Sequence, residues 1–512
     1  MTDQELHLLL EDMSLQEKID QLLQLTADFY GKTDRDVVTG PASELGISME
    51  DIDLAGSVLN GTGAKALMQI QDAYMDRHPH HIPLLFMMDV IHGYRTIFPA
   101  PIAQGASFDP EMSKKAASVA AREASAAGIH VVFSPMVDLV RDPRWGRVME
   151  STGEDPYLNS RFAAAQIHGF QGDDMKEDGK VCGCIKHFAG YGGAEAGREY
   201  NTVQVSEHTF REYYLPSYEA GIKAGAGMVM TSFNTINDIP ATINQKLMRQ
   251  MLREEMGFDG VLISDYAAIL ETVAHGASSD KKDAAHKALL AGVDIDMMTG
   301  CYAGELAKLV KEGTIPESLI DESVLRILQL KNQLGLFEHP HKDADPEKEA
   351  RYILCPEHRA LAREAAAASC VLLKNDKVLP IRPSQKVAFI GPYIDNTRFA
   401  AAGPSPDIQR TPSRSDRPLR NCSRTLTSPF ATARRFFRVT TSLPALQSQI
   451  APKNFMPTCL RIRKRHWQMQ SRPLRLLMSS FCVLESITSR PAKRPHALSF
   501  PFRRIRWSCF AQ

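Results

Sequence analysis

The chain has 512 residues, and its 60 basic and 60 acidic side chains cancel to a formal net charge of zero. This length exceeds one ordinary hydrophobic core, so we expect two domains or one large barrel with an addition. No apolar run is long enough to cross a bilayer, and the acidic start differs from a secretory signal, which together predict a cytoplasmic protein without a membrane partner.

The first part of the chain alternates short apolar runs with helical stretches. A capping-box pattern at Ser14 and Glu17 predicts the opening helix. Asp109-Pro110 and Asp155-Pro156 each place a capping side chain before a proline at the first helical position. From about residue 54 to residue 337, this alternation is typical of a parallel sheet.

Seven apolar segments are the predicted strands of that sheet. Because they are apolar on both faces, they are expected to be buried parallel strands. No Gly-x-Gly-x-x-Gly follows an early strand, so a (β/α)8 TIM-type barrel over residues 1–337 is favoured over an open doubly wound sheet. The segments are 55–61, 82–89, 129–138, 181–188, 225–233, 260–266 and 291–298.

Polar side chains stand where several of these segments end. Asp89, Asp138, His187 and Asp265 all occupy carboxyl ends of apolar runs. The loops at that end of a barrel build the active site, so we expect these side chains to converge on one rim. Cys182 and Cys184 lie near His187, but residues two apart in a strand merely share a face, and we expect no metal there.

The sequence after residue 337 changes character twice. The polar residues 338–357 indicate a linker, and residues 358–400 indicate the start of a second, α/β sandwich domain, with a helix leading into a strand near 370–375 and another strand after residue 384. From residue 401 to 512 the apolar periodicity fades. That tail holds 18 Arg and 3 Lys against 3 acidic residues, whereas the rest of the chain holds 39 basic and 57 acidic residues.

Two interpretations of the tail remain open. A disordered basic arm for nucleic acid is one. The interpretation favoured here is translation in a shifted reading frame, since GC-rich codons read out of frame yield Arg, Pro, Ser and Ala in excess. The acidic balance of residues 1–400 argues against nucleic acid as a partner.

Motifs in the order MSLQEKIDQL, PLLFMMDVIHG, DPRWGRVMESTGEDPYL, IKHFAGYGGAEAGREYN, MVMTSFN, VLISDY and RILQLKNQLGLF resemble glycoside hydrolase family 3 over about residues 13–396. This resemblance implies a retaining β-glycosidase of the β-glucosidase type, acting on terminal glucosyl residues without a metal or cofactor. β-Xylosidase activity is the related alternative. A catalytically impaired frameshift product is the other alternative.

The resemblance also implies roles for single residues. Asp265 is similar to the family nucleophile, and its plainer alternative is a helix N-cap. Asp89, Arg147, Lys186 and His187 are similar to residues that hold the sugar hydroxyls, although strand-end caps, a surface ion pair or ordinary loop residues would look alike. In addition, Met230 is expected against the sugar or in the core, Tyr266 is expected to stack on the ring, and Glu150 and Glu154 are interpreted as structural.

The general acid is missing from the written sequence. In the β-glucosidase branch it is a Glu of the second domain, in a segment resembling GEH...GEAxSR, which this chain lacks. Codons for Cys482 to Ala497, shifted by two nucleotides, permit a peptide of the form LGEHYxxxGEAxxR. The acetylglucosaminidase branch instead uses a His-Asp pair in a motif like KHFPGHGDT, and the corresponding KHFAGYGGAEAGREYN disfavours that branch.

Overall fold

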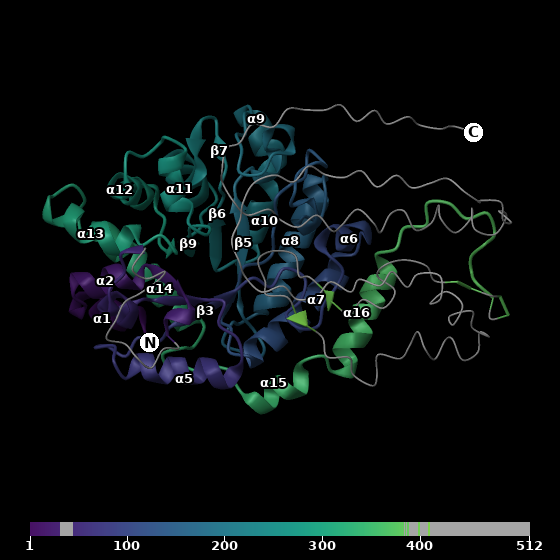
Figure 1. The fold of residues 1–512 in the computed structure, drawn as a ribbon, viewed down its shortest axis with the longest axis horizontal. Coiled ribbons are helices and arrows are strands. Elements are labelled where there is room, and N and C mark those ends of the chain that lie inside the picture. The colour runs from purple at the N-terminus through teal and green to yellow at the C-terminus, as the bar shows by residue number, and fades with distance from the viewer. Residues whose placement is uncertain (31–44, 383, 386, 389–397, 400–407, 410–512) are drawn as a thin grey trace, which may run out of the picture. The chain divides into compact units, whose positions relative to one another are not determined.

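The computed structural model describes the chain except residues 31–44, 383, 386, 389–397, 400–407 and 410–512. Its central feature is a sheet of eight parallel strands with helices packed on the outside (Figure 1). In spatial order the strands are β10 Asp296–Met297, β1 Leu23–Thr26, β2 Ser57–Leu59, β3 Leu85–Met88, β4 Val131–Val132, β5 Cys182–Phe188, β6 Met228–Thr231 and β9 Val261–Ile263.

Backbone pairing joins the two ends of this strand order. β1 pairs with β10, with Leu23 opposite Asp296. At the other end, a parallel bridge joins Ile263 of β9 to Ile295, the residue before β10. The Ser264 amide also donates to the Ile295 carbonyl oxygen at 2.9 Å. The sheet is therefore the (β/α)8 barrel that the alternating pattern predicts.

Each of the seven predicted segments contains one barrel strand, and the eighth strand, β1, was not predicted. In its sequence LQLT the polar Gln24 and Thr26 alternate with two leucines, so it lacks the continuous apolar run of the other segments. Gln24 is nevertheless fully buried, and its side-chain amide donates to Met87 Sδ at 2.9 Å. Because this buried polar side chain has a hydrogen-bond partner, the strand is stable without being apolar, and a search for apolar runs does not find it.

The helices begin where the capping patterns predict. Asp109 accepts a hydrogen bond from Met112 N, Asp155 accepts one from Leu158 N, and Ser14 forms the expected capping box. The helices are α1 Asp3–Asp12, α2 Leu15–Gln21, α4 Met49–Leu54, α5 Ala64–Met75, α6 Pro101–Ala106, α7 Pro110–Ala126, α8 Pro156–Gln171, α9 Glu207–Thr209, α10 Pro216–Lys223, α11 Ala268–Ala274, α12 Lys281–Ala291, α13 Cys301–Lys311 and α14 Ser318–Gln333.

One apolar core fills the space between strands and helices. All seven residues of β5 and all four residues of β3 are buried. Alanine-rich faces of α7 and α12 allow these helices to approach the sheet closely, because a methyl group occupies little space. Outside the barrel, β7 Thr235–Ile236 and β8 Ile239–Pro240 form a short hairpin.

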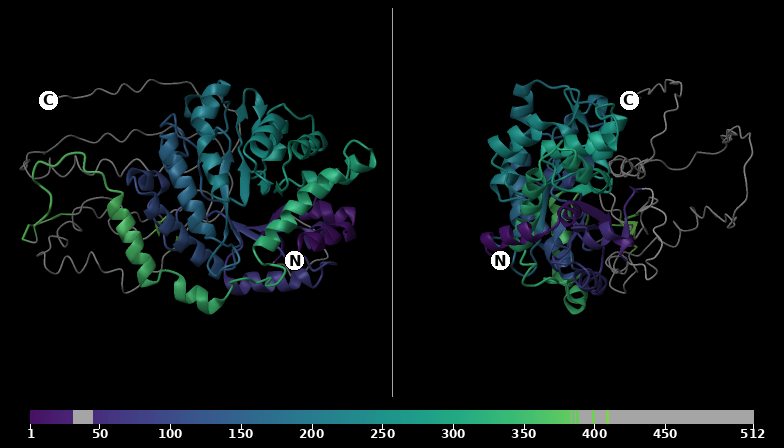
Figure 2. Two further views of the ribbon diagram at one scale, coloured as in Figure 1. Left: turned by 180° about the vertical axis from the view of Figure 1, so that it is seen from behind. Right: turned by 90° about the vertical axis from the view of Figure 1, so that its left-hand side faces the viewer.

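The predicted linker, residues 338–357, lies against the barrel and contacts it at several points between Pro340 and Leu354 (Figure 2). It contains α15 Pro346–Tyr352. Asp343 accepts hydrogen bonds from Ser125 Oγ at 2.5 Å and from Gly179 N at 2.6 Å. Ser125 precedes β4 and Gly179 precedes β5, so this segment crosses the amino-terminal face of the barrel.

The predicted helix that follows is present as α16 Pro356–Ala368. The strand expected near residues 370–375 is wrong for the described structure, because Val371, Leu372 and Leu373 are exposed and belong to no strand. A strand stays in place only when a neighbouring strand pairs with it. β11 Arg398–Phe399 pairs antiparallel with β12 Ile408–Gln409. Most of the strand expected after residue 384 and nearly all of the tail lie outside the described residues, so the second domain stays a prediction.

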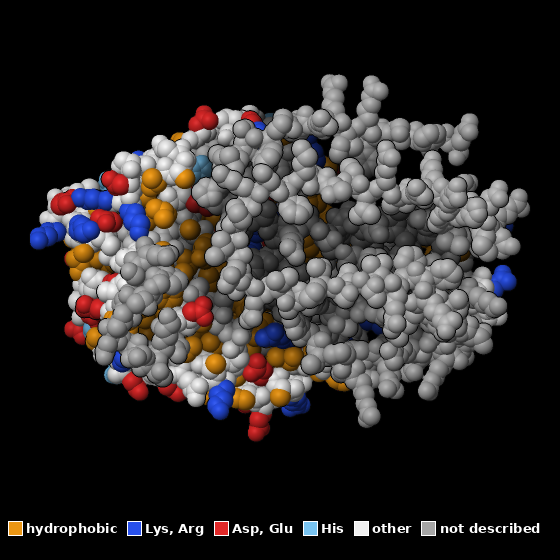
Figure 3. Space-filling view, viewed as in Figure 1, with side chains coloured by type: hydrophobic (Ala, Val, Ile, Leu, Met, Phe, Trp, Pro, Cys, Tyr) orange, Lys and Arg blue, Asp and Glu red, His pale blue; other side chains and the backbone are white. Residues whose placement is uncertain are grey.

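Acidic and basic side chains are interspersed on the described surface that Figure 3 presents. Among the described residues, no helix combines the length and apolar character that crossing a bilayer requires.

Candidate active site

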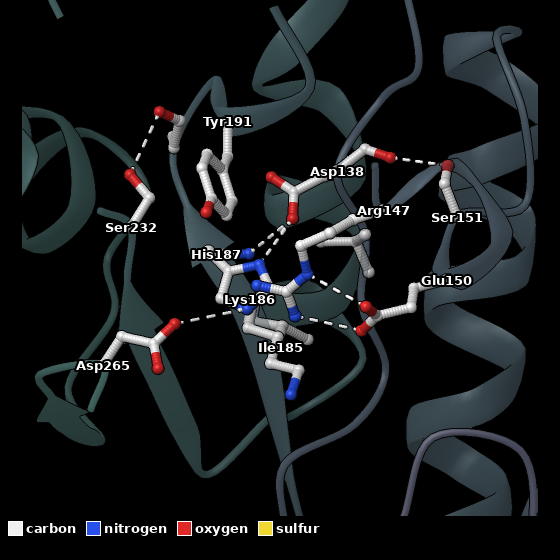
Figure 4. Close-up of polar contacts among 12 residues, drawn as sticks. Asp138, Arg147, Glu150, Ser151, Ile185, Lys186, His187, Tyr191, Ser232 and Asp265 are labelled. Carbon is white, nitrogen blue, oxygen red and sulfur yellow. Dashed lines mark hydrogen bonds and ion pairs between the residues drawn. The ribbon is translucent and has the colours of Figure 1, made fainter. Parts of the chain in front are cut away.

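Charged side chains from four barrel strands and their loops meet at the carboxyl end of the barrel. Asp89 directly follows β3, Lys186 and His187 belong to β5, and Asp265 lies two residues beyond β9. Arg147 extends inward from the long loop after β4, as Figure 4 shows. The predicted convergence of these side chains on one rim is therefore present in the fold.

Asp265 is a buried carboxylate with one oxygen left unbonded. Its Oδ1 accepts a hydrogen bond from Tyr266 N at 2.6 Å, whereas its Oδ2 accepts none from the described residues. His187 Nε2 lies 3.4 Å from that Oδ2. Burial raises the pKa of Asp265 to about 6, although the positive charges of Arg147 and Lys186 oppose this rise. The N-cap alternative lacks support, because the bonded amide belongs to the next residue and not to a helix.

Lys186 and Asp89 form a buried ion pair at the same end of the barrel. The Lys186 Nζ atom donates to Asp89 Oδ1 at 2.6 Å, and the two side chains are 3% and 8% exposed. A buried pair of this kind is stable only with good geometry, since both charges lose water. Both groups can also exchange this bond for hydrogen bonds to a polar ligand.

Arg147 is fixed in place by Glu150. Its Nε and one terminal nitrogen donate to the two oxygens of Glu150 at 2.9 and 3.0 Å, a bidentate pair. Burial alone would raise the pKa of Glu150, but Arg147 reverses the effect and lowers it. The guanidinium also lies 5.6 Å from the ring centre of Tyr191. The expected structural role of Glu150 agrees with this contact, and Glu154 lies exposed on the same loop.

His187 lies between two carboxylates, as Figure 4 shows. Its Nδ1 is 2.8 Å from Asp138 Oδ2, and its backbone N donates to the same oxygen at 3.0 Å. Tyr218 from α10 reaches the other oxygen of Asp138 at 2.8 Å. Burial lowers the pKa of His187 well below its usual value, and the nearby Arg147 and Lys186 lower it further. Sequence reasoning placed Asp138 at the rim but gave it no role.

The two softer assignments differ in exposure. Met230 is buried in the main apolar core, which agrees with the core alternative. Tyr266 is 47% exposed beside Asp265, as a ring that stacks on a ligand would be. Tyr200 and Phe233, which the sequence analysis did not single out, form an edge-to-face aromatic pair with ring centres 4.7 Å apart.

Two other sets of potential metal ligands among the described residues have places in the fold. Cys182 and Cys184 are buried in the apolar core as free thiols, and burial raises the pKa of Cys182 to about 12. A second group comprises Glu17, His78 and His80. Glu17 caps α2 and accepts from His80 at 2.7 Å, so it already serves the fold near the amino-terminal end of the barrel.

The chain resembles known proteins over the described region. Residues 14–330 match the glycosyl hydrolase family 3 N terminal domain. A periplasmic β-glucosidase of Salmonella typhimurium is 37% identical over 77% of this chain and 52% of its own length. A putative β-xylosidase of Formosa agariphila is 32% identical over 76% of this chain and 54% of its own length.

Solved structures give the same relationship. A β-glucosidase from Listeria innocua, solved with glucose, is 49% identical and superposes with a TM-score of 0.73, covering 75% of this chain and 54% of that one. A mutant of that enzyme was solved with laminaribiose. The chain thus spans about half the length of the relatives it matches. It belongs to glycosyl hydrolase family 3 and carries the family's N-terminal barrel domain.

Proposed function

We propose that this chain is the barrel half of an exo-acting retaining β-glycosidase of the β-glucosidase type, with Asp265 as its nucleophile. The observation that carries the proposal is the unbonded Oδ2 of the buried Asp265, close to the positive charges of Arg147 and Lys186. A structural carboxylate would be expected to use both oxygens. The names of the Salmonella and Listeria relatives favour glucose as the sugar.

The reaction would proceed in two displacements. Asp265 Oδ2 attacks the anomeric carbon while the bond to the leaving oxygen breaks, and that oxygen takes a proton from a general acid. The resulting ester is then attacked by water, whose proton returns to the same group, and Asp265 is released with the anomeric configuration retained. Lys186, Asp89, Arg147 and His187 would hold the sugar hydroxyls through hydrogen bonds that strengthen in the transition state.

The general acid decides how active this exact chain is. The expected Glu belongs to the second domain, whose sequence signature is absent from residues 401–512. A missing acid slows cleavage by about 10² to 10⁴-fold when the leaving group needs a proton. A phenolate leaves without one, so an aryl glucoside is expected to form the glycosyl-enzyme far better than cellobiose does.

The test of the proposal is covalent labelling. A 2-deoxy-2-fluoro glucoside with an activated aryl leaving group should attach to Asp265, which peptide mass spectrometry would locate. Labelling at another carboxylate, or none on a version whose reading frame is restored beyond residue 400, would contradict the assignment. Equal cellobiose hydrolysis by the written and restored versions would place the acid within residues 1–400.

β-Xylosidase activity is the second candidate, because some relatives carry that name. Comparing aryl glucoside with aryl xyloside in the labelling reaction distinguishes the two. The cytoplasmic location stays a prediction, and the Salmonella relative is named as periplasmic.

A further inference from the structure

Both carboxyl oxygens of Asp138, at the barrel mouth, have hydrogen-bond partners, and the side chain faces His187. It is 1% exposed, as are His187 and Tyr218. Its Oδ2 lies 2.8 Å from His187 Nδ1 and 3.0 Å from the His187 backbone N. Two nitrogen atoms of one residue therefore converge on one carboxyl oxygen.

The backbone nitrogen necessarily carries a hydrogen, so Oδ2 must be an acceptor. A carboxyl oxygen without a proton at 2.8 Å from Nδ1 can only accept there as well, which places the imidazole hydrogen on Nδ1. Burial and the neighbouring cations Arg147 and Lys186 lower the pKa of His187 well below the usual value, which favours the neutral imidazole. A neutral imidazole carries a single N–H, so Nε2 presents a lone pair.

Protonation of Asp138 at Oδ1 keeps this arrangement. The Tyr218 hydroxyl lies 2.8 Å from Asp138 Oδ1 and 2.5 Å from the His187 carbonyl oxygen, but it has only one hydrogen to donate. If the carbonyl receives it, Oδ1 can carry its own proton and donate to Tyr218. Burial raises the pKa of Asp138 to about 7, so both forms exist near neutral pH. Oδ2 therefore accepts from both nitrogens in the ionised form and in the form whose proton is on Oδ1.

We propose that Asp138 is a positioning residue that holds His187 in the Nδ1–H tautomer, so that Nε2 faces Asp265 Oδ2 as an acceptor at 3.4 Å. Nε2 then donates no hydrogen bond to the nucleophile, which agrees with the unbonded state of that oxygen. Nε2 would instead accept a hydrogen bond from a hydroxyl group of the bound sugar. The opposite tautomer would place an N–H against Asp265 and weaken its attack.

This inference rests on the proposed function for its kinetic consequence, but not for the tautomer itself. The tautomer is measured on the full chain by nitrogen-15 chemical shifts after selective labelling of histidine. The chain has 16 His, so the His187→Gln variant identifies the signals of His187 by their loss. The expected result is a protonated Nδ1 and an unprotonated Nε2. The reverse assignment would overturn the inference whether or not the chain hydrolyses any glycoside.

Two substitutions separate positioning from folding. Asp138→Asn can keep an oxygen toward both nitrogens and present its amide to Tyr218, so its tautomer and labelling rate should stay close to wild type. Asp138→Ala removes the acceptor, and Nε2 should take the hydrogen and slow labelling of Asp265 by about 10- to 100-fold, the usual cost of losing an orienting partner. Equal losses in the two variants would contradict the positioning role.

A double variant completes the test. In a His187→Ala background, Asp138→Ala should have no further effect on the labelling rate, because its influence passes through the missing imidazole. If Asp138→Ala lowered the labelling rate further in this background, Asp138 would act through the stability of the fold and not through His187, which would contradict the positioning role. If Asp138→Ala does not fold, the wild-type spectrum and Asp138→Asn still decide the matter. If Asp265 is never labelled while His187 has the expected tautomer, the proposed function fails and the tautomer assignment stands.

Discussion

Two buried carboxylates show how differently one fold can treat the same chemical group. Asp265 lies at the mouth of the barrel, and Glu123 lies where α7 meets α16. Glu123 accepts hydrogen bonds from two backbone amides of the 95–96 turn, from the Thr96 hydroxyl, from Leu354 N and from His358 Nδ1. Asp265 accepts one at Oδ1 and none at Oδ2 from the described residues.

The pKa values follow from this difference. Burial by itself acts to raise the pKa of both carboxyl groups. For Glu123, hydrogen bonds from His358 and Thr96 reverse the rise, and its pKa ends below the usual value. For Asp265, nearby cations offset only part of it. The number of donors, more than burial, thus separates a carboxylate that holds the fold together from one available for attack.

The largest expected effect on activity comes from removing the carboxylate charge of Asp265 at the mouth of the barrel. Asp265→Asn should reduce turnover of an aryl glucoside by about 10⁴-fold or more in the frame-restored protein, because an amide does not attack the anomeric carbon at a useful rate. Glu123→Gln is the matched control, and its turnover should stay near wild type. Steady-state kinetics of both variants would check this, and comparable losses would remove the distinction between the two carboxylates.

The next largest effect concerns stability at the α7–α16 junction. Glu123→Ala leaves several buried donors without an acceptor, so we expect a loss of about 3–5 kcal/mol in the free energy of unfolding. Thermal or denaturant unfolding of the full chain would measure it. Glu123→Gln should lose less, because its side-chain oxygen still accepts. Unchanged stability in the alanine variant would show that these hydrogen bonds contribute little.

At the mouth of the barrel, replacing the acidic side chain of Asp265 should raise the free energy of unfolding, the opposite of the effect at Glu123. The folded pKa of Asp265 is raised to about 6, so the folded state prefers the protonated form and loses stability as pH rises from about 4 through 6. Asp265→Asn removes that loss and should stabilise the protein by about 1–3 kcal/mol at pH 7. The gain should vanish near pH 4, where the wild-type side chain is protonated. A destabilised variant at pH 7 would contradict the raised pKa.

The smallest effect is on the pH dependence of labelling. Asp265 attacks as a carboxylate, so the rate of labelling by the fluoro glucoside should fall by about tenfold for each pH unit below about 6. Glu123, whose pKa is lowered, stays ionised over this range and adds no second step. A labelling rate that stays constant between about pH 5 and 7 would show that Asp265 titrates at its ordinary value.

The sequence predicted the barrel well because its strands are buried on both faces, and continuous apolar runs such as β3 and β5 reveal them. It missed β1, whose Gln24 is buried with a sulfur partner. It also placed Asp89, Lys186 and His187 on one rim, since parallel strands end on the same side. Which oxygen of Asp265 remains unbonded depends on side-chain geometry from several strands, and no local pattern encodes that.

The bonds between Asp138 and His187 were beyond sequence reasoning for the same reason. Both residues stand at the ends of predicted strands, but 49 residues separate them and only the register of β4 beside β5 brings them together. The strand predicted at Val371–Leu373 was wrong for the opposite reason, because there the local sequence favours a strand that the fold does not form. Its apolar β-branched and leucine residues favour a strand locally, yet strand formation requires a partner that the described residues do not supply.

The packing of residues 338–369 on the barrel has a practical consequence for dividing the protein. A cut after residue 337 would follow the end of the family's barrel motifs, yet it would remove His358 and Leu354 from Glu123 and Asp343 from Gly179. In the shortened barrel, Glu123 would lose two of its hydrogen-bond donors and become exposed to solvent. For expression of the barrel alone, the C-terminal boundary therefore belongs just beyond α16, near residue 369.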